Sequence, residues 1–135
     1  MKKIIYTKKA PIPIGPYVQG IIFNNIIITS GQIPINPIYN KIDSNDIEKQ
    51  TVQVLKNIKS IINKAHFSIK NIVKTTIFLI NLNDFNIINN VYKKFFIENN
   101  ANYPARTCIE VSRLPQNAKI EIEAIAIKPN NNNYY

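Results

Sequence analysis

The fold is decided by residues 45–80, which read NDIEKQTVQVLKNIKSIINKAHFSIKNIVKTTIFLI. The first half repeats apolar residues at helical spacing, with lysines mostly on the other side of the predicted helix. These apolar residues are Ile47, Val54, Leu55, Ile58, Ile61, Ile62 and Ala65. Asn45 and Glu48 stand three residues apart and predict a capping box at the helix start. The second half, residues 69–80, is rich in β-branched side chains and predicts a buried strand.

Three short strands are predicted before this helix. Residues 4–6 can form an edge strand, and residues 20–23 and 26–30 are β-rich runs. Asn24 and Asn25 separate these two runs and tolerate the left-handed conformations of a tight hairpin turn. Pro11, Pro13 and Pro16 exclude regular structure before the hairpin, and Pro34 and Pro37 lie in a second predicted loop after it. The segment therefore predicts an edge strand and a hairpin joined by stiff loops.

A second helix, predicted to begin after Asp84, is followed by two final strands. Its apolar stripe is Ile88, Val91, Tyr92 and Phe95. The strands are predicted at residues 105–111 and 120–127, with Pro115 in the loop between them. The order strands, helix, strand, helix, strands indicates an α+β fold in which two amphipathic helices cover one face of the sheet. The other face keeps many apolar side chains, so we expect an obligate oligomer.

The composition indicates one globular domain. The chain has 135 residues, of which 45% are apolar, enough to bury one core. Its single cysteine, Cys108, excludes an internal disulfide and is typical of a reducing compartment. The basic start lacks the apolar region of a signal peptide, and no run approaches the roughly 20 apolar residues of a membrane span. We expect a cytoplasmic protein without a membrane partner, with a single domain at residues 1–129 and a disordered Asn-rich tail at residues 130–135.

The net charge of +9 invites a nucleic-acid partner, but its distribution argues against one. The lysines are spread along the chain, and Lys, Asn and Ile are over-used together. All three are encoded by A/T-rich codons, so nucleotide bias accounts for the charge. No cofactor or metal is expected either, because one histidine, one cysteine and three separated glycines form neither a zinc site nor a phosphate-binding loop.

One arginine lies inside an otherwise apolar predicted strand. Alternation along that strand puts Arg106 on the same face as Cys108 and Glu110. A buried guanidinium is costly unless it finds an anion. Spacing alone slightly favours an internal ion pair with Glu110, Glu121 or Glu123. The alternative is a fork for the carboxylate of a small ligand, held by two parallel charge-assisted hydrogen bonds.

Four stretches of the chain, taken together and in order, resemble the RidA (YjgF) family. They are IGPYVQG at residues 14–20, TSGQIP at residues 29–34, VKTT at residues 73–76, and the segment from residue 104 to residue 124 that begins PARTCIEV and ends IEIEA. Each stretch is weak evidence alone, but the set covers nearly the whole chain apart from the Asn-rich tail. The resemblance implies a single RidA-like domain.

The resemblance also implies a structure and an activity. The fold would be the chorismate-mutase-like (YjgF) α+β fold, with a mixed sheet and two helices on one face. It would assemble as a homotrimer with sites between neighbouring subunits. The activity would be hydrolysis of 2-iminopropanoate and 2-iminobutanoate to 2-oxo acids and ammonia, without a cofactor. These imines, and their enamine tautomers, escape from pyridoxal-phosphate dehydratases and damage other pyridoxal-phosphate enzymes.

Two residues would carry the reaction according to this resemblance. Arg106 would bind the substrate carboxylate with its planar fork, and Glu121 would position or activate the attacking water. The backbone of Cys108 would hydrogen-bond the substrate, while its thiol is expected to be only a small apolar group. Glu110 and Glu123 are expected to have structural roles.

Four further positions match the family's substrate-binding residues. Tyr17 would close the pocket over the substrate's alkyl group, although interface packing explains this ring equally well. Ser30 and Gly31 would offer a hydroxyl and backbone amides to an anion, although turn geometry alone could require Gly31. Asn89 would lie near the cleft on the second helix.

Two other functions stay open. Some members of the family are described as translation inhibitors or ribonucleases, but a ribonuclease needs an acid–base pair, and His66 is the only histidine. We expect His66 to lie at a solvated helix end. The other alternative is a ligand-binding member without catalysis, against which the presence of both Arg106 and Glu121 argues.

Overall fold

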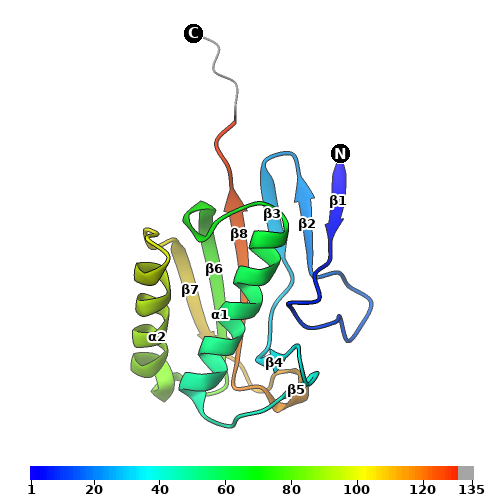
Figure 1. Cartoon of the computed structure of the whole chain (residues 1–135). Helices are drawn as coiled ribbons and strands as arrows, with labels where there is room; N and C mark the ends of the chain where they lie inside the picture. Colours follow the sequence, from blue (N-terminus) through cyan, green and yellow to red (C-terminus); the bar gives the residue numbers. More distant parts are fainter. Residues whose placement is uncertain (131–135) are drawn as a thin grey trace.

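Six strands form one mixed sheet in the order β1-β2-β3-β8-β6-β7 (Figure 1). They are β1 (Lys2–Ile5), β2 (Gly20–Phe23), β3 (Ile26–Thr29), β6 (Ile72–Leu79), β7 (Ala105–Glu110) and β8 (Ile120–Ile127). All neighbours pair antiparallel except β6 and β7, which are parallel and joined through a helix. The computed structural model describes residues 1–130, so the predicted tail at residues 130–135 lies, except for Asn130, outside the described residues.

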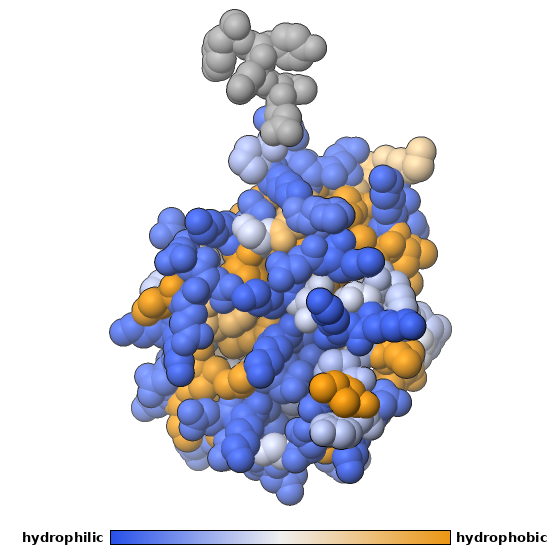
Figure 2. Space-filling view, in the orientation of Figure 1, coloured by the Kyte–Doolittle hydropathy of each residue, from blue (hydrophilic) through white to orange (hydrophobic). Residues whose placement is uncertain are grey.

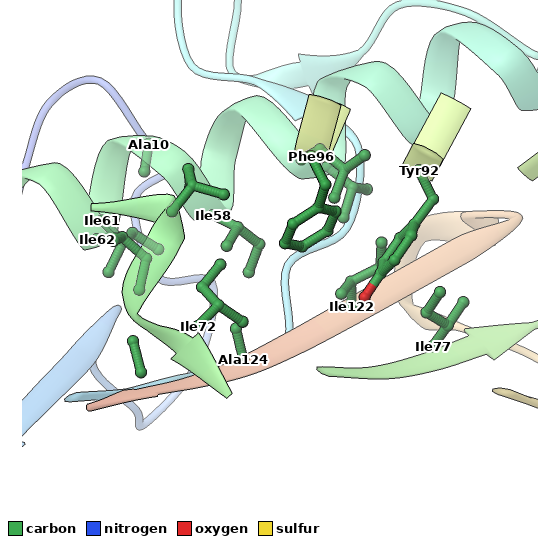
Figure 3. Close-up of a cluster of buried hydrophobic side chains, with 14 of the residues drawn as sticks. Ala10, Ile58, Ile61, Ile62, Ile72, Ile77, Tyr92, Phe96, Ile122 and Ala124 are labelled. Carbon is green, nitrogen blue, oxygen red and sulfur yellow. The ribbon is translucent and has the colours of Figure 1, made fainter. Parts of the chain in front are cut away.

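The helices α1 (Ile47–Lys64) and α2 (Phe85–Glu98) lie on the same face of this sheet (Figure 1), as predicted. Their apolar stripes meet the central strands in one core, seen in Figure 3. The stripe predicted for α1 is confirmed, but α2 places Phe96 in the core and leaves Phe95 half-buried. The reason is geometric, since Ile88, Tyr92 and Phe96 are spaced by four and form one row along the helix.

The start of α1 differs by one residue from the prediction. Asp46, not Asn45, is the N-cap, and its carboxylate accepts a hydrogen bond of 2.9 Å from the backbone N–H of Lys49. The capping box predicted from Asn45 and Glu48 is therefore wrong. A carboxylate at this position also stabilises the positive end of the helix dipole.

The second helix and the central strand also begin differently from the prediction. Asp84 is the N-cap of α2 by position, but its side chain makes no capping hydrogen bond. The strand predicted at residues 69–80 begins at Ile72, because Ile69–Asn71 forms a 3₁₀ turn closed by a capping box between Ser68 and Asn71. β-Branched residues alone did not signal this turn.

The hairpin of β2 and β3 is confirmed, and Asn24 has the expected left-handed φ of 54°. A second hairpin, of β4 (Ile35–Asn36) and β5 (Lys41–Ile42), was not predicted. Its anchor is tertiary, because the amide of buried Asn57 in α1 donates hydrogen bonds to the carbonyls of Ile33 and Ile35, of 3.2 and 2.9 Å. The flanking prolines of this segment hid the hairpin from sequence reasoning.

The face of the sheet opposite the helices is open and partly apolar, as the pattern predicts. Ile28 on β3 is 53% exposed and Ile109 on β7 is 42% exposed. The view in Figure 2 shows the helix side instead, where hydrophilic residues predominate and apolar ones form separate patches. Within residues 1–130, neither helix has the length and apolar character that crossing a bilayer requires.

Candidate functional site

Arg106 lies half-buried on the edge strand β7, on the side of the sheet that the helices cover. In the parallel ladder its partner is Thr75, whose hydroxyl meets the Tyr92 hydroxyl of α2. The Arg106 guanidinium lies over two aromatic rings of α2, 4.9 Å from the centroid of Tyr92 and 5.5 Å from that of Phe85. Ring faces attract cations through their electron density, so α2 holds this charge without a carboxylate.

The internal ion pair that spacing favoured is not formed. Among residues 1–130 the one salt bridge joins Lys94 and Glu98 on the surface of α2. Glu110 instead accepts a hydrogen bond of 3.0 Å from the backbone N–H of Leu82. Without a carboxylate partner inside the described chain, the fork of Arg106 is available to an external anion.

A cavity of about 330 Å³ opens beside this guanidinium, and we call it the arginine pocket. It is lined by Asn89, Tyr92, Lys93, Tyr103, Pro104 and Arg106. The structure therefore brings two predicted residues, Asn89 and Arg106, to one cavity. Both charged groups in its lining are cations, which favours an anionic occupant.

A second hollow, of about 510 Å³, collects most of the other predicted residues. This glutamate hollow is lined by Ile14, Tyr17, Thr29, Ser30, Gly31, Ile33, Pro115, Glu121 and Glu123. The Tyr17 hydroxyl accepts a hydrogen bond of 3.1 Å from the backbone N–H of Ile14, which fixes the ring at the rim. The Ser30 hydroxyl donates a hydrogen bond of 2.6 Å to the carbonyl of Val18. Its oxygen can therefore act toward a ligand only as a hydrogen-bond acceptor.

The absence of a side chain at Gly31 leaves room for the Glu121 side chain. A Cβ at residue 31 would collide with Oε1 of Glu121, and φ at Gly31 is not in the left-handed region. A side chain at residue 31 would displace the end of the Glu121 side chain, so glycine lets this carboxylate approach the backbone closely. Gly31 does not have the positive φ that would make turn geometry the reason for a glycine.

The Glu121 carboxyl holds its proton more tightly than a free glutamate. Burial raises its pKa, and the neighbouring Glu123 carboxylate raises it further. A raised pKa makes the carboxylate a stronger base and its protonated form easier to populate than in a free glutamate, which favours general acid–base work.

Cys108 packs against the core from the same face of β7 as Arg106. Burial raises the pKa of its thiol, and the nearby Arg106 charge offsets part of this rise. The thiol therefore stays protonated at neutral pH, which agrees with its expected role as a small apolar group.

The arginine pocket and the glutamate hollow lie on opposite faces of the sheet. Arg106 is in register with Thr75 of β6, whereas Glu121 is in register with Phe78 of the same strand. Residues 75 and 78 are an odd number apart, so their side chains point to opposite faces. One chain therefore carries two separate cavities, and neither holds both residues predicted to be catalytic.

Sequence reasoning missed the residues that surround Arg106. Tyr92 was assigned only to the apolar stripe of α2, and Phe85, Thr75 and Lys93 had no assigned role. A usable signal was present, because Thr75 and Tyr92 are polar-tipped residues at predicted core positions. Such groups need a hydrogen-bond partner when buried, and here they are each other's partner.

The sequence model of the family described as Endoribonuclease L-PSP matches residues 7–128. This chain belongs to that family, the RidA (YjgF) family. The 2-iminobutanoate/2-iminopropanoate deaminase of Escherichia coli K12 is 52% identical over 95% of this chain and 99% of its own. A RutC family protein of Buchnera aphidicola is 58% identical over 95% of this chain and 99% of its own.

Solved structures of the RidA family agree with this fold. The crystal structure of E. coli TdcF with bound serine superposes with a TM-score of 0.92 at 48% identity, covering 94% of this chain and 99% of that one. The YjgF gene product of E. coli gives the same TM-score at 50% identity, with the same coverage of both chains. The predicted family and the α+β fold with two helices and a mixed sheet are confirmed.

Proposed function

We propose that this protein is an imine deaminase, which hydrolyses 2-iminobutanoate and 2-iminopropanoate to 2-oxo acids and ammonia. One observation carries the proposal: the Arg106 guanidinium borders an open cavity and has no carboxylate partner within residues 1–130. Relatives about half identical over nearly the full chain bear the name of this activity, which supports it. Removal of such imines would protect pyridoxal-phosphate enzymes.

The complete site would form between two copies of the chain in a homotrimer. A half-site with Arg106 and a half-site with Glu121 lie on opposite faces of one sheet, so they meet only if a second copy is packed beside the first. The open, partly apolar face that carries Ile28 and Ile109 supplies a surface for this packing.

In this site Arg106 binds the substrate carboxylate and sets the distance of the imine carbon from Glu121 of a neighbouring copy. Glu121 takes a proton from water as the water oxygen bonds to that carbon, the C=N π pair moves to nitrogen, and Glu121 passes the same proton to nitrogen to give a neutral carbinolamine. Glu121 then accepts the carbinolamine hydroxyl proton and delivers it to nitrogen as the C–N bond breaks, which leaves a C=O group and ammonia. Tyr17 covers the alkyl group.

Other residues orient the substrate. Ser30 and Gly31 offer a hydroxyl and a backbone amide to the rim of the site, and the Asn89 amide hydrogen-bonds the substrate from the arginine pocket. The backbone of Cys108, two residues after Arg106 on β7, hydrogen-bonds the substrate beside this pocket. Water adds to an imine readily, so orientation and one proton-transfer group suffice for useful acceleration.

The decisive experiment couples the protein to a threonine dehydratase and follows the appearance of 2-oxobutanoate. Wild type is expected to accelerate it, while Arg106→Ala loses about a hundredfold or more of the added rate, since two charge-assisted hydrogen bonds disappear. Arg106→Lys is expected to lower the added rate at least about tenfold, because a lysine ammonium cannot form the two parallel hydrogen bonds of a guanidinium. Arg113→Ala, at the only other arginine, is the control and keeps the rate. Equal rates for all variants remove Arg106 from the site.

Cleavage of RNA is the second candidate, and the name of the matching family favours it. Against it, His66 is exposed beyond the end of α1 and lines neither the arginine pocket nor the glutamate hollow. Cleavage of single-stranded RNA that survives repurification and is unchanged in Arg106→Ala would establish this function in place of the deaminase. Binding of 2-oxobutanoate without any catalysis would identify a ligand-binding member of the family.

A further inference from the structure

We propose that Tyr92, anchored by Thr75, is the positioning residue of Arg106: its ring carries the guanidinium in place of a counter-ion and keeps the fork free for the substrate. The inference rests on the proposed function, because it assigns Arg106 to substrate binding. It names a residue outside the set that sequence reasoning selected.

Three elements meet at this point. Tyr92 of α2 is 4% exposed, and its hydroxyl is directed to the sheet (Figure 3), where it lies 2.6 Å from Oγ1 of Thr75 in β6. Thr75 is 2% exposed and stands beside Arg106 of β7 in the parallel ladder. The hydrogen bond thus ties the ring to the strand next to the one that carries the guanidinium.

The Tyr92 ring stabilises the guanidinium charge without occupying its N–H donors. A carboxylate would occupy the N–H donors of Arg106 and compete with the substrate for them. Attraction to the face of Tyr92, 4.9 Å from the guanidinium carbon, requires no hydrogen-bond acceptor. The charge is therefore stabilised while its donors stay available to the two oxygens of a ligand carboxylate.

The Thr75 hydroxyl keeps the ring in one orientation, and burial keeps the phenol neutral. A buried phenol needs a hydrogen-bond partner, and Thr75 supplies it. Burial raises the pKa of Tyr92, although the Thr75 hydrogen bond and the Arg106 charge oppose this rise. A neutral phenol does not capture the guanidinium as an ion pair, so Arg106 keeps facing the pocket.

Phe85 is a weaker partner on the same helix. Its ring is 38% exposed and lies 5.5 Å from the guanidinium carbon, farther than Tyr92. Attraction between a cation and a ring falls with exposure to water. We therefore assign the positioning role to Tyr92 and only assistance to Phe85.

The experiment compares Tyr92→Leu, which removes the ring, with Tyr92→Phe, which keeps it. Tyr92→Leu is expected to raise KM for the imine, and the dissociation constant of 2-oxobutanoate measured by calorimetry, about three- to thirtyfold with a smaller change in kcat. Tyr92→Phe rescues the ring and is expected to stay within about threefold of wild type on both measures. Phe95→Leu is the matched control, an aromatic of α2 that contacts Phe96 and not the guanidinium. It lowers stability without raising KM.

A second measurement reads the position of Arg106 without any ligand. The Arg106 Nε–H signal in a proton–nitrogen correlation spectrum is expected to be shifted upfield by the Tyr92 ring in wild type. The upfield shift is expected to remain but the signal to broaden in Tyr92→Phe, which keeps the ring without its Thr75 anchor, and the shift is expected to disappear in Tyr92→Leu. If Tyr92→Leu does not fold, Thr75→Val tests the anchor instead, with the ring present and the signal broadened.

The outcomes separate this inference from the proposed function. An unchanged dissociation constant and an unchanged Nε–H signal in folded Tyr92→Leu overturn the inference, and so does a Tyr92→Phe variant as impaired as Tyr92→Leu. If no form of the protein hydrolyses the imine, the proposed function fails. The inference then still stands if Tyr92→Leu weakens 2-oxobutanoate binding or moves the Arg106 signal, and falls if it does neither.

Discussion

At the scale of single residues, the raised pKa of Glu121 sets the pH dependence of the proposed reaction. Burial and the Glu123 carboxylate favour the protonated form, so the carboxylate needed as a base is lost at a higher pH than for an ordinary glutamate. We expect kcat/KM to fall on acidification through this raised pKa. Glu123→Gln removes the like charge and is expected to move the fall to lower pH. Glu121→Gln is expected to lose most activity and the pH dependence.

The raised pKa of Glu121 also predicts how the stability of the protein depends on pH. Because the folded pKa of Glu121 lies above its unfolded value, ionisation costs the folded state more than the unfolded state. Relative to wild type, Glu121→Gln is therefore expected to gain stability as pH rises through the raised pKa, and to lose this gain below the unfolded pKa. Urea titrations from acidic to neutral pH measure the difference, and a constant difference would contradict the shift.

The sequence predicted the positions of several single residues of the candidate site. Strand alternation placed Arg106 and Cys108 on one face, and the family pattern placed Asn89 near the cleft. The structure puts Asn89 in the arginine pocket with Arg106 and Gly31 in the glutamate hollow with Glu121. What the sequence did not indicate is what holds Arg106. Tyr92 occurs at the helical spacing of a core residue, so the sequence does not distinguish core packing from contact with Arg106. The three-dimensional contacts of its ring do.

At the scale of elements, the start of α1 tests whether the observed cap or the predicted one supports the helix. Asp46→Ala removes the carboxylate that accepts the Lys49 N–H and is expected to lower the free energy of unfolding by about 1 kcal/mol. Asn45→Ala is the matched control, since the hydrogen bond at Asn45 uses its backbone carbonyl, which accepts from Lys119 Nζ. Equal destabilisation by both changes in urea unfolding would argue against Asp46 as the cap.

Helical periodicity predicted both helices, and β-rich stretches predicted the six main strands, although the first of them spans Lys2–Ile5 rather than residues 4–6. Both signals failed where a tertiary contact or a local cap decides the local structure. The β4–β5 hairpin depends on hydrogen bonds from Asn57, more than twenty residues later in the chain. The turn before β6 depends on Ser68 and Asn71 closing a capping box, a pairing that β propensity does not report.

At the scale of the whole molecule, the sequence predicted the layer order and the open face but not the separation of the half-sites. Alternation fixes the face of each residue within its own strand. The faces of Arg106 and Glu121 become comparable only through the register of β7 and β8 on β6, where they oppose Thr75 and Phe78. Register is a property of the folded sheet, so the sequence pattern left open whether one chain could hold both residues.

The separation gives a sharp test of assembly. Arg106→Ala and Glu121→Gln are each expected to be inactive, since every site in such an assembly lacks one partner. Unfolding and refolding a half-and-half mixture brings an intact Arg106 of one copy next to an intact Glu121 of another in about one interface in four, so about a quarter of wild-type activity returns. A double variant carrying both changes, mixed with wild type, is the control for dilution. Failure of the single variants to complement, while both refold and assemble, would place the reaction within one chain and contradict the shared site.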